Sequence, residues 1–340
     1  MFGMTNYRSQ SIIALCTLSL ASTAHADEFF KDKIITIINS TGNGGSYFNI
    51  AQVLTRHMPK FIPGNPGMVV KSMPGGGNVL ATNFMYNVAP KDGTHIATIN
   101  NSIPLHQVLD GKGVRYDASK FNWLGSPGTY NSVAYVWHDA GVKTIADLKQ
   151  KEITLGGTGV GSSIVIYPMV MNKLLNTKFK IILGYQSTMQ IDIAMERGEV
   201  AARTGSYSAL MADHPDWMPE KKVVLLAQIG GKREIGLEHV PLLTELAENE
   251  EQRQILKLVS SPIALGRPYL TPPGVPEERV AILRNAFQAA LRDPACLDEM
   301  KRIQTDIDPV SAEDIARIVR DTVDAPKDII EKAKAAMDNM

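Results

Sequence analysis

Residues 34–58 read IITIINSTGNGGSYFNIAQVLTRHM, and this stretch decides the fold. The β-branched run at 34–38 is typical of a buried strand, and a glycine-rich loop at 40–46 follows it. Beyond the loop, apolar residues recur at helical spacing, namely Ile50, Val53, Leu54 and Met58. The stretch therefore predicts a strand, a tight turn and a helix, which is the first half of a parallel βαβ unit.

The same alternation continues along the chain. Strands are expected at 68–72, 94–100, 132–137, 152–155, 180–185, 200–204 and 223–228, with helices around 78–88, 144–150, 163–175 and 189–197. A proline-rich linker at 262–276 precedes closing helices at 276–292, after the capping pair Ser311 and Asp314, and at 327–338. The pattern predicts an α/β chain in two halves, each a mainly parallel sheet flanked by helices.

Composition limits the classes of function. The chain has 340 residues, enough for two domains with their own cores, and its 35 Lys and Arg balance 35 Asp and Glu. This balance argues against a broad nucleic-acid surface. The 44% apolar and 21% charged content is typical of a folded soluble protein, whereas 27 glycines, many of them clustered, are unusual.

The first 26 residues are predicted to be a secretion signal. The apolar run at 11–20 is shorter than the roughly 20 residues that cross a membrane, and Ala24-His25-Ala26 fits a cleavage site. We therefore expect the mature chain to begin at Asp27 and to be periplasmic. After cleavage Cys296 is the one cysteine, so no internal disulfide is expected.

Catalytic and cofactor templates do not fit the sequence. No serine has glycine at both two residues before and two residues after it, and the histidines lack zinc-site spacing. A phosphate-binding lysine loop is absent, and Gly42-Asn43-Gly44 has Tyr47 where a dinucleotide fingerprint needs a third glycine. The sequence therefore predicts no catalytic residue, no metal site and no cofactor.

Two glycine-rich loops, at 40–46 and 156–163, are the candidate binding elements because each lies between a strand and a helix. Free backbone N–H groups and the positive end of the helix dipole make such a junction an anion site. For either loop alone a purely structural turn is an equal alternative, but a matched pair in successive halves favours binding. The candidate ligand-binding residues here are Ser40, Thr41, Asn43, Gly44, Tyr47 and Phe48 in the first half and Thr158, Gly159, Gly161, Ser162 and Ser163 in the second.

Arg203 is a candidate cation for the same site. It lies among small residues near the end of the strand at 200–204, where α/β sheets present ligand contacts, and its planar fork suits a carboxylate. The alternative is a structural ion pair with Glu196 or Glu199. Ser206, just beyond the strand, is a further candidate hydroxyl.

Aromatic residues near the turns could form an apolar wall for the ligand. Tyr47, Phe48 and Tyr185 are the candidates, and core filling is the alternative for each. Pro74-Gly75-Gly76-Gly77 forms another strand-to-helix turn, for which a structural role is at least as well supported as ligand contact.

Several motifs, in chain order, are similar to a known family. They are Gly44-Gly45-Ser46-Tyr47-Phe48, Met73-Pro74-Gly75-Gly76-Gly77-Asn78, Ala89-Pro90-Lys91-Asp92-Gly93-Thr94, the loop at 156–163, and Pro272-Pro273-Gly274-Val275-Pro276. Together they resemble the solute-binding proteins of tripartite tricarboxylate transporters, the TctC or Bug-like family. The resemblance implies a two-lobed Venus-flytrap periplasmic binding fold. It also implies that the two loops and bridging waters hold a carboxylate between the lobes, and that a membrane permease is the partner.

The resemblance suggests a division into lobes and a class of ligand. We expect lobe 1 at 27–133 plus 258–340 and lobe 2 at 134–257. Where the family commonly carries Asp and Arg, this chain has Phe48 and Gln52, which disfavours an amino-acid ligand and favours a carboxylate with an apolar or aromatic body. Arg203 is then a candidate partner for a second, distal carboxylate.

The sequence thus predicts a periplasmic solute-binding protein without enzymatic activity. Its expected partners are a small organic acid, either a mono- or a dicarboxylate, and the transmembrane permease subunits of a transporter, but no nucleic acid. One alternative is a periplasmic sensor that presents a carboxylate to a membrane signalling protein. Another is a secreted hydrolase or isomerase, which the missing nucleophile and metal spacings disfavour.

Overall fold

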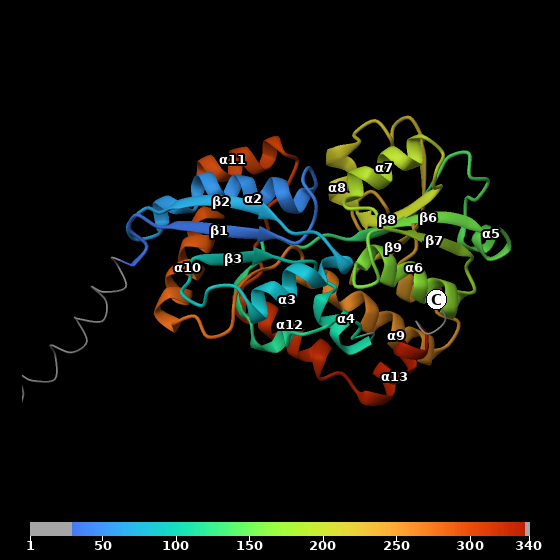
Figure 1. The fold of residues 1–340 in the computed structure, drawn as a ribbon. Helices are drawn as coiled ribbons and strands as arrows, with labels where there is room; N and C mark the ends of the chain where they lie inside the picture. The colour runs from blue at the N-terminus through green and yellow to red at the C-terminus, as the bar shows by residue number, and fades with distance from the viewer. Residues whose placement is uncertain (1–28, 110, 337–340) are drawn as a thin grey trace, which may run out of the picture.

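The computed structural model describes residues 29–109 and 111–336, which form two α/β lobes side by side (Figure 1). The predicted secretion signal at 1–26 lies outside the described residues. The first sheet runs, in spatial order, β2 (Gly67–Ser72), β1 (Ile34–Asn39), β3 (His95–Thr98), β10 (Tyr269–Thr271) and β4 (Asn122–Gly125). The second runs β7 (Phe179–Leu183), β6 (Ile153–Gly157), β8 (Ala202–Ser206), β5 (Ser132–Trp137) and β9 (Val223–Ile229).

The two sheets share one topology. In the first, β1 pairs in parallel with β2 and β3, and β10 is inserted antiparallel between β3 and β4. In the second, β6 pairs in parallel with β7 and β8, and β5 is inserted antiparallel between β8 and β9. The loops that follow β1 and β6 therefore occupy equivalent positions at the carboxyl ends of the parallel strands, where α/β sheets place ligands.

Helices cover both faces of each sheet (Figure 1). Around the first sheet lie α2 (Ser46–His57) and α11 (Pro294–Arg302) on one face, with α3 (Val79–Asn87) and α12 (Ala312–Val323) on the other; α4 (Ile103–Leu109) and α10 (Glu277–Ala290) complete this lobe. Around the second lie α7 (Thr188–Glu196) and α8 (Tyr207–Asp213) on one face, with α6 (Ser163–Leu175) and α9 (Glu250–Ser260) on the other; α5 (Ile145–Gln150) and α13 (Lys327–Ala335) lie beside them.

Burial on both faces explains the near-continuous β-branched run of β1. Ile35 and Ile37 pack into the core beneath α2 and α10, whereas Ile38 points to the opposite core beneath α3 and α12. All three are at most 1% exposed. A half-solvated strand would instead alternate apolar and polar residues.

The predicted two-lobed α/β architecture is confirmed, but several short elements escaped the sequence patterns. The expected strand at 200–204 is β8, two residues further along, and the short strands β4 and β10 were not predicted. The three residues of β10 lie between Pro268 and Pro272, so their composition indicates a linker. The helices α4, α8, α9 and α11 were likewise missed.

The chain passes between the sheets after β4 and again before β10. The C-terminal helix α13 then packs against α9, and Ala333 belongs to the core beneath the second sheet. The residue bounds expected for the two lobes remain a prediction.

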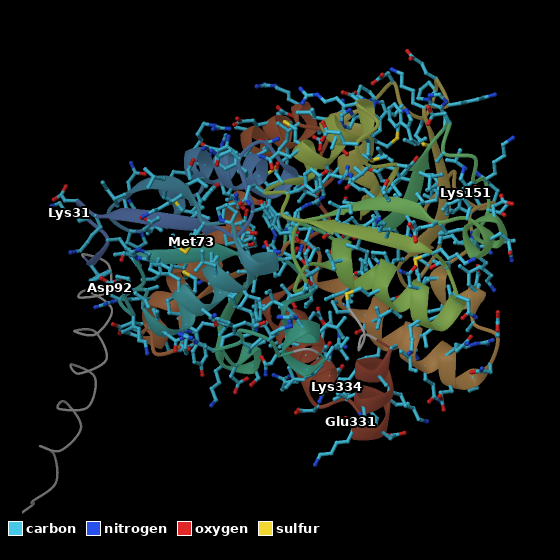
Figure 2. The ribbon with its side chains drawn as sticks, turned by 45° about the vertical axis from the view of Figure 1, so that its right-hand side comes forward. Lys31, Met73, Asp92, Lys151, Glu331 and Lys334 are labelled. Atoms are coloured by element: carbon cyan, nitrogen blue, oxygen red, sulfur yellow. The ribbon has the colours of Figure 1, made fainter. Side chains whose placement is uncertain are left out.

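Figure 2 shows the long axis of the molecule, with Lys31 and Asp92 near one end and Lys151 toward the other. Glu331 and Lys334 project from α13, where their charged groups pair at 2.9 Å. Within the two described ranges, no helix combines the length and the apolar character needed to cross a membrane.

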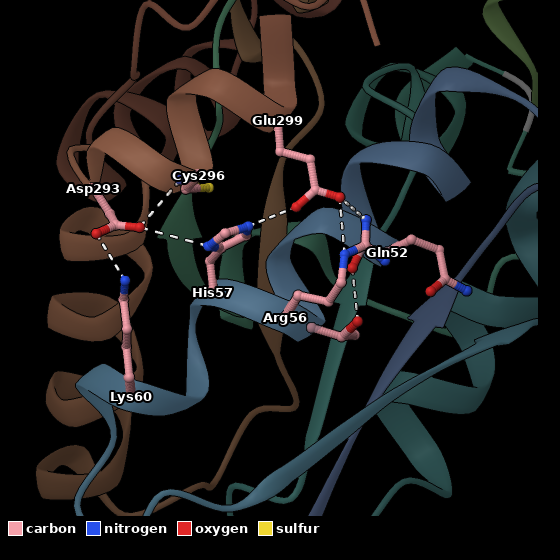
Figure 3. A network of polar contacts seen from close by, with 8 residues as sticks. Gln52, Arg56, His57, Lys60, Asp293, Cys296 and Glu299 are labelled. Atoms are coloured by element: carbon pink, nitrogen blue, oxygen red, sulfur yellow. Dashed lines mark hydrogen bonds and ion pairs between the residues drawn. The ribbon is translucent and has the colours of Figure 1, made fainter. Parts of the chain in front are cut away.

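A network of charged side chains joins α2 to α11 in the first lobe (Figure 3). His57 lies between two carboxylates, with Nε2 2.6 Å from Glu299 Oε2 and Nδ1 3.5 Å from Asp293 Oδ2. Arg56 also pairs with Glu299, and Lys60 Nζ lies 2.7 Å from Asp293 Oδ1. The Arg56 guanidinium, assisted by His57, holds the pKa of Glu299 below its ordinary value.

This network predicts an acid-sensitive contribution to stability. A carboxyl group whose pKa is lowered by folding stabilises the protein above its unfolded pKa, about 4.3 for glutamate, and loses that effect as the pH falls further. We expect Glu299→Gln to lower the free energy of unfolding at pH 7 by about 0.5–1 kcal/mol, since the group is partly exposed. Urea unfolding should show the difference from the wild type shrinking below about pH 4.

The matched control is Glu152→Gln, because Glu152 is exposed. That variant should follow the wild type throughout. The prediction would be contradicted if the difference in the free energy of unfolding between Glu299→Gln and the wild type stayed constant from pH 7 to pH 3.

Candidate functional site

A cavity of about 290 Å³ lies between the two lobes. The first turns of α2, α6 and α7 line it with Ser46, Ser163 and Thr188, and Asn78 at the start of α3 does the same. Several helix N-termini therefore direct free N–H groups and the positive ends of their dipoles toward one volume.

The wall of the cavity is polar but carries little charge. Arg203 is the only charged side chain among the described residues that line it, and no aspartate or glutamate does so. Besides three tyrosines, the rest of the polar lining consists of neutral donors and acceptors: Ser40, Thr41, Ser46, Asn78, Asn100, Ser132, Thr158, Ser162, Ser163, Gln186, Ser187, Thr188 and Ser206. Such a wall can hydrogen-bond an anion without a repelling carboxylate.

The first loop is braced so that backbone groups face the cavity. At its start, Asn39 Nδ2 donates to Thr41 O at 2.9 Å and to Ser72 Oγ at 3.0 Å. The N-cap of α2 is Gly45, which has no side chain to cap the helix, and the first turn contains no acidic residue. Ser40 Oγ is buried and, within the described chain, has no hydrogen-bond partner. A buried orphan hydroxyl at a cavity wall indicates a missing partner.

The second loop holds the equivalent position in the other lobe. Ser162 caps α6 by accepting from Ile164 N at 3.3 Å, and Ser163 begins the helix. Across the cleft, Ser102 Oγ donates to Gly161 O at 2.7 Å. Gly42 N likewise donates across the cleft to Gln186 O at 3.2 Å. The lobes are therefore joined by direct hydrogen bonds.

Glycine allows the two lobes to approach this closely. A Cβ on Gly159 would lie 2.5 Å from Gly77 N, and a Cβ on Gly77 would lie 2.6 Å from Gly161 N. Both distances are shorter than any real Cβ contact, and Gly77 also has a φ of +64°. The Pro74 to Gly77 turn thus contacts the opposite lobe, in addition to lining the cavity.

Three tyrosines line the cavity. Tyr47 Oη lies 3.3 Å from Tyr130 Oη and 3.4 Å from Gly266 O, so it joins α2 to both segments that pass between the sheets. Burial, and next the neighbouring Tyr130, raise the pKa of Tyr47 well above its ordinary value, so its phenol is neutral. Tyr185 lines the cavity from the other lobe.

Arg203 lines the cavity but is already paired. Its Nε lies 2.7 Å from Asp192 Oδ1, its Nη2 donates to Asp192 Oδ2 at 3.1 Å, and both side chains are 1% exposed. His214 Nε2 lies 3.1 Å from the same carboxylate. The ion pair weighed as the alternative therefore exists, but with Asp192 on α7 instead of Glu196 or Glu199.

The structure brings most of the predicted residues together. Those that line the cavity are Ser40, Thr41, Tyr47, Thr158, Ser162, Ser163, Tyr185, Arg203 and Ser206. The remaining candidates are not among the described residues that line it: Asn43, Gly44, Phe48, Gly159 and Gly161. Asn43 is exposed and accepts from Ser72 Oγ at 2.7 Å, whereas Gly159 and Gly161 form the contact between lobes.

Sequence reasoning missed residues that reach the site from other elements. Asn100 and Tyr130 line the cavity from turns without a glycine-rich signature, and Asn78 lines it directly after the Pro74 to Gly77 turn, for which a structural role was the alternative. Arg267, in the segment before β10, donates to Ser46 and Ser206, which both line the cavity. Its signal, a lone arginine between Gly266 and Pro268, is indistinguishable from linker composition.

A family model and several solved structures are similar to this chain. The profile of the Tripartite tricarboxylate transporter family receptor matches residues 50–335. A search of curated protein sequences finds no match. Among solved structures, the periplasmic binding protein BugD is similar with a TM-score of 0.72 and 18% identity, over 89% of this chain and 98% of that one.

Two further similar structures contain ligands. MatC from Rhodopseudomonas palustris with bound malate has a TM-score of 0.68 and 16% identity, over 88% of this chain and 99% of that one. Rpa4515 from R. palustris with adipate has a TM-score of 0.67 and 16% identity, over 88% of this chain and 97% of that one. These likenesses confirm the two-lobed periplasmic-binding-protein fold.

The glycine contact predicts that a single methyl group will hold the lobes apart. Gly159→Ala adds a Cβ against Gly77 N in the closed arrangement alone, and overpacking of this kind costs about 1–3 kcal/mol. The open population should rise about tenfold or more, which small-angle scattering would detect as a larger radius of gyration. Gly231→Ala is the control, because no described heavy atom lies within 4 Å of its added Cβ. Equal radii for the two variants would refute the contact.

The Arg203 ion pair predicts a separate effect on stability. Arg203→Met leaves the buried Asp192 carboxylate with His214 beside it but without its arginine, and should lower the free energy of unfolding by about 3 kcal/mol. Adding Asp192→Leu removes that carboxylate, so the double variant should recover most of the loss in urea unfolding. No recovery in the double variant would show that Arg203 stabilises the lobe in another way.

Proposed function

Because the chain belongs to the tripartite tricarboxylate transporter receptor family, we propose that it captures a small organic carboxylate between its lobes and delivers it to a membrane permease. The observation that carries this proposal is the cavity between the lobes, lined by helix N-termini, hydroxyls and amides and by no aspartate or glutamate of the described chain. Such a wall stabilises negative charge without needing a large positive net charge.

One carboxylate group binds at the paired loops. The uncapped first turn of α2 offers backbone N–H groups, and Ser40 Oγ offers a hydroxyl that is otherwise unpaired. From the other lobe, Ser163 and Thr158 face the same volume. An anion that bridges donors from both lobes binds the closed arrangement more tightly than the open one, so binding favours closure.

The rest of the ligand is small. A cavity of about 290 Å³ is at the lower end of the range of ligand pockets, and Tyr47, Tyr130 and Tyr185 provide apolar ring surface beside the polar donors. The malate and adipate held by two structures of the same fold are acids of this size class, which supports a short dicarboxylate.

Arg203 contributes less than its position on the strand suggests. Its Nε and Nη2 are directed at Asp192, which neutralises its charge next to the cavity. We therefore place the distal end of the ligand against hydroxyls and amides, with Arg203 as part of the wall. The periplasm is the compartment, reached through the signal predicted at 1–26.

A thermal-shift and calorimetry panel of malate, adipate and benzoate, with adipamide as the uncharged analogue of adipate, tests the proposal. A carboxylate at a hundredfold its Kd adds about 2.7 kcal/mol to the stability of the native state and so raises Tm. Adipamide has the same length without charge and should leave Tm unchanged. The proposal fails if no organic acid of the panel raises Tm, if adipamide matches adipate, or if incubation yields a chemical product.

A further inference from the structure

Arg267 is a buried cation that reaches both lobes. It is 6% exposed and lies in the segment between Leu265 and β10, one of the two that pass between the sheets. Its Nε donates to Ser46 Oγ of the first lobe at 3.2 Å. Its Nη2 donates to Ser206 Oγ of the second lobe at 3.1 Å, and Ser208 Oγ lies 3.4 Å away.

Among the residues that the structure describes, the guanidinium has no ion-pair partner. No carboxylate of the described chain lies within ion-pair distance of Arg267, in contrast to Arg203. Its other neighbours are aromatic, with Cζ 4.3 Å from the Tyr130 ring centre and 5.9 Å from that of Tyr47. Asp213 lines the same small hollow without forming an ion pair with Arg267; burial is the main influence on its pKa and raises it, whereas the charges of Arg203 and Arg267 act to lower it.

The position makes the unpaired charge more costly. Ser46 is the first residue of α2, so Arg267 lies against the positive end of a twelve-residue helix. Like-signed charge at a helix N-terminus is unfavourable, and a buried charge without a counter-ion is more so. A negative group in the adjoining cavity would compensate both.

Two serine hydroxyls connect the Arg267 guanidinium to the cavity. A serine hydroxyl has two lone pairs and one hydrogen. Ser206 Oγ accepts from Arg267 and from Ala209 N at 3.2 Å, so its hydrogen must be donated, either to Ser208 Oγ at 2.9 Å or to a ligand. Ser46 Oγ also accepts from Arg267, and its hydrogen is available to the cavity that it lines. The arginine thus turns one hydroxyl of each lobe into a donor.

We propose that Arg267 is the positioning residue that couples closure of the lobes to the charge of the ligand. It holds Ser46 and Ser206 together across the cleft and orients both as donors, and a carboxylate in the cavity adds negative charge beside a guanidinium that has no ion-pair partner among the described residues. This inference rests on the proposed function, since it assigns the charge selectivity of that same site to a residue behind the wall.

The test compares Arg267→Met, which removes the charge but keeps an apolar side chain, with the matched control Arg279→Met. Arg279 also stacks on an aromatic ring, with Cζ 3.5 Å from the centre of Phe29, and donates to Asp92 O at 3.0 Å, but does not line the cavity. Calorimetry measures the Kd for malate, adipate, benzoate and adipamide. Small-angle scattering measures closure, and thermal unfolding without ligand measures stability.

We expect Arg267→Met to weaken binding of the best carboxylate about tenfold or more, the loss expected for one charge-assisted interaction. Its ligand-free Tm should not fall, because an uncompensated buried charge has been removed. More of that carboxylate should be needed to reduce the radius of gyration. Arg279→Met should bind as the wild type does, and Arg267→Lys, which keeps the charge but loses the fork, should be intermediate.

Two results would overturn the inference while leaving the proposed function intact. One is carboxylate binding by Arg267→Met that equals that of the wild type. The other is a lower ligand-free Tm in Arg267→Met together with an equal loss of carboxylate affinity in the lysine and methionine variants. That combination would indicate a merely structural role for Arg267. If Arg267→Met does not fold, carboxylate affinity and ligand-free Tm are compared between Arg267→Lys and the wild type instead. Failure of the wild type to bind any acid of the panel overturns the proposed function, and this inference with it.

Discussion

Contact between two glycine backbones governs how the lobes meet. Gly77 and Gly159 approach so closely that a methyl group on either would overlap the other lobe. This approach brings Ser102 within hydrogen-bond distance of Gly161 and limits the space between the lobes to about 290 Å³. The size of an acceptable ligand therefore follows from glycine at the contact, because any larger residue there would widen the cleft.

The repeated sheet topology explains why so many helix N-termini surround one cavity. In each sheet one strand, β10 in the first and β5 in the second, runs antiparallel to its neighbours. Each of these strands follows a segment that crosses between the lobes, so it starts at the cleft. The parallel strands run in the opposite direction and therefore end at the cleft. The helices that follow them begin at the cavity wall. Their dipoles act over a few ångströms, so a chain with 35 basic and 35 acidic residues can still offer a locally positive site.

Sequence patterns predicted the elements that are defined by local physics and missed those defined by packing. The β-branched run of β1 and the glycine loop behind it are local signals, and both lie where the pattern indicated. The three residues of β10 are too few to show a strand pattern. They form a strand because they pair with β3 and β4, which precede them by more than 140 residues. Helical period located α2, but it could not show that Tyr47 faces the cavity while Phe48 does not. Asp192 pairs with Arg203 because α7 packs over β8, which no local spacing reveals.

The two buried arginines of the cleft illustrate different solutions to one electrostatic problem. Arg203 carries its counter-ion with it, so its charge is balanced whether the lobes are open or closed. Arg267 contacts serine oxygens and aromatic rings from both lobes and the segments between them, and among the described residues no carboxylate forms an ion pair with it. Opening the cleft would return its guanidinium to water, whereas closing it empty would bury a cation beside a helix N-terminus. Under the proposed function, a negatively charged ligand favours the closed state because its charge compensates the buried Arg267 guanidinium. A neutral molecule of the same shape does not compensate that charge, so burying the guanidinium stays unfavourable.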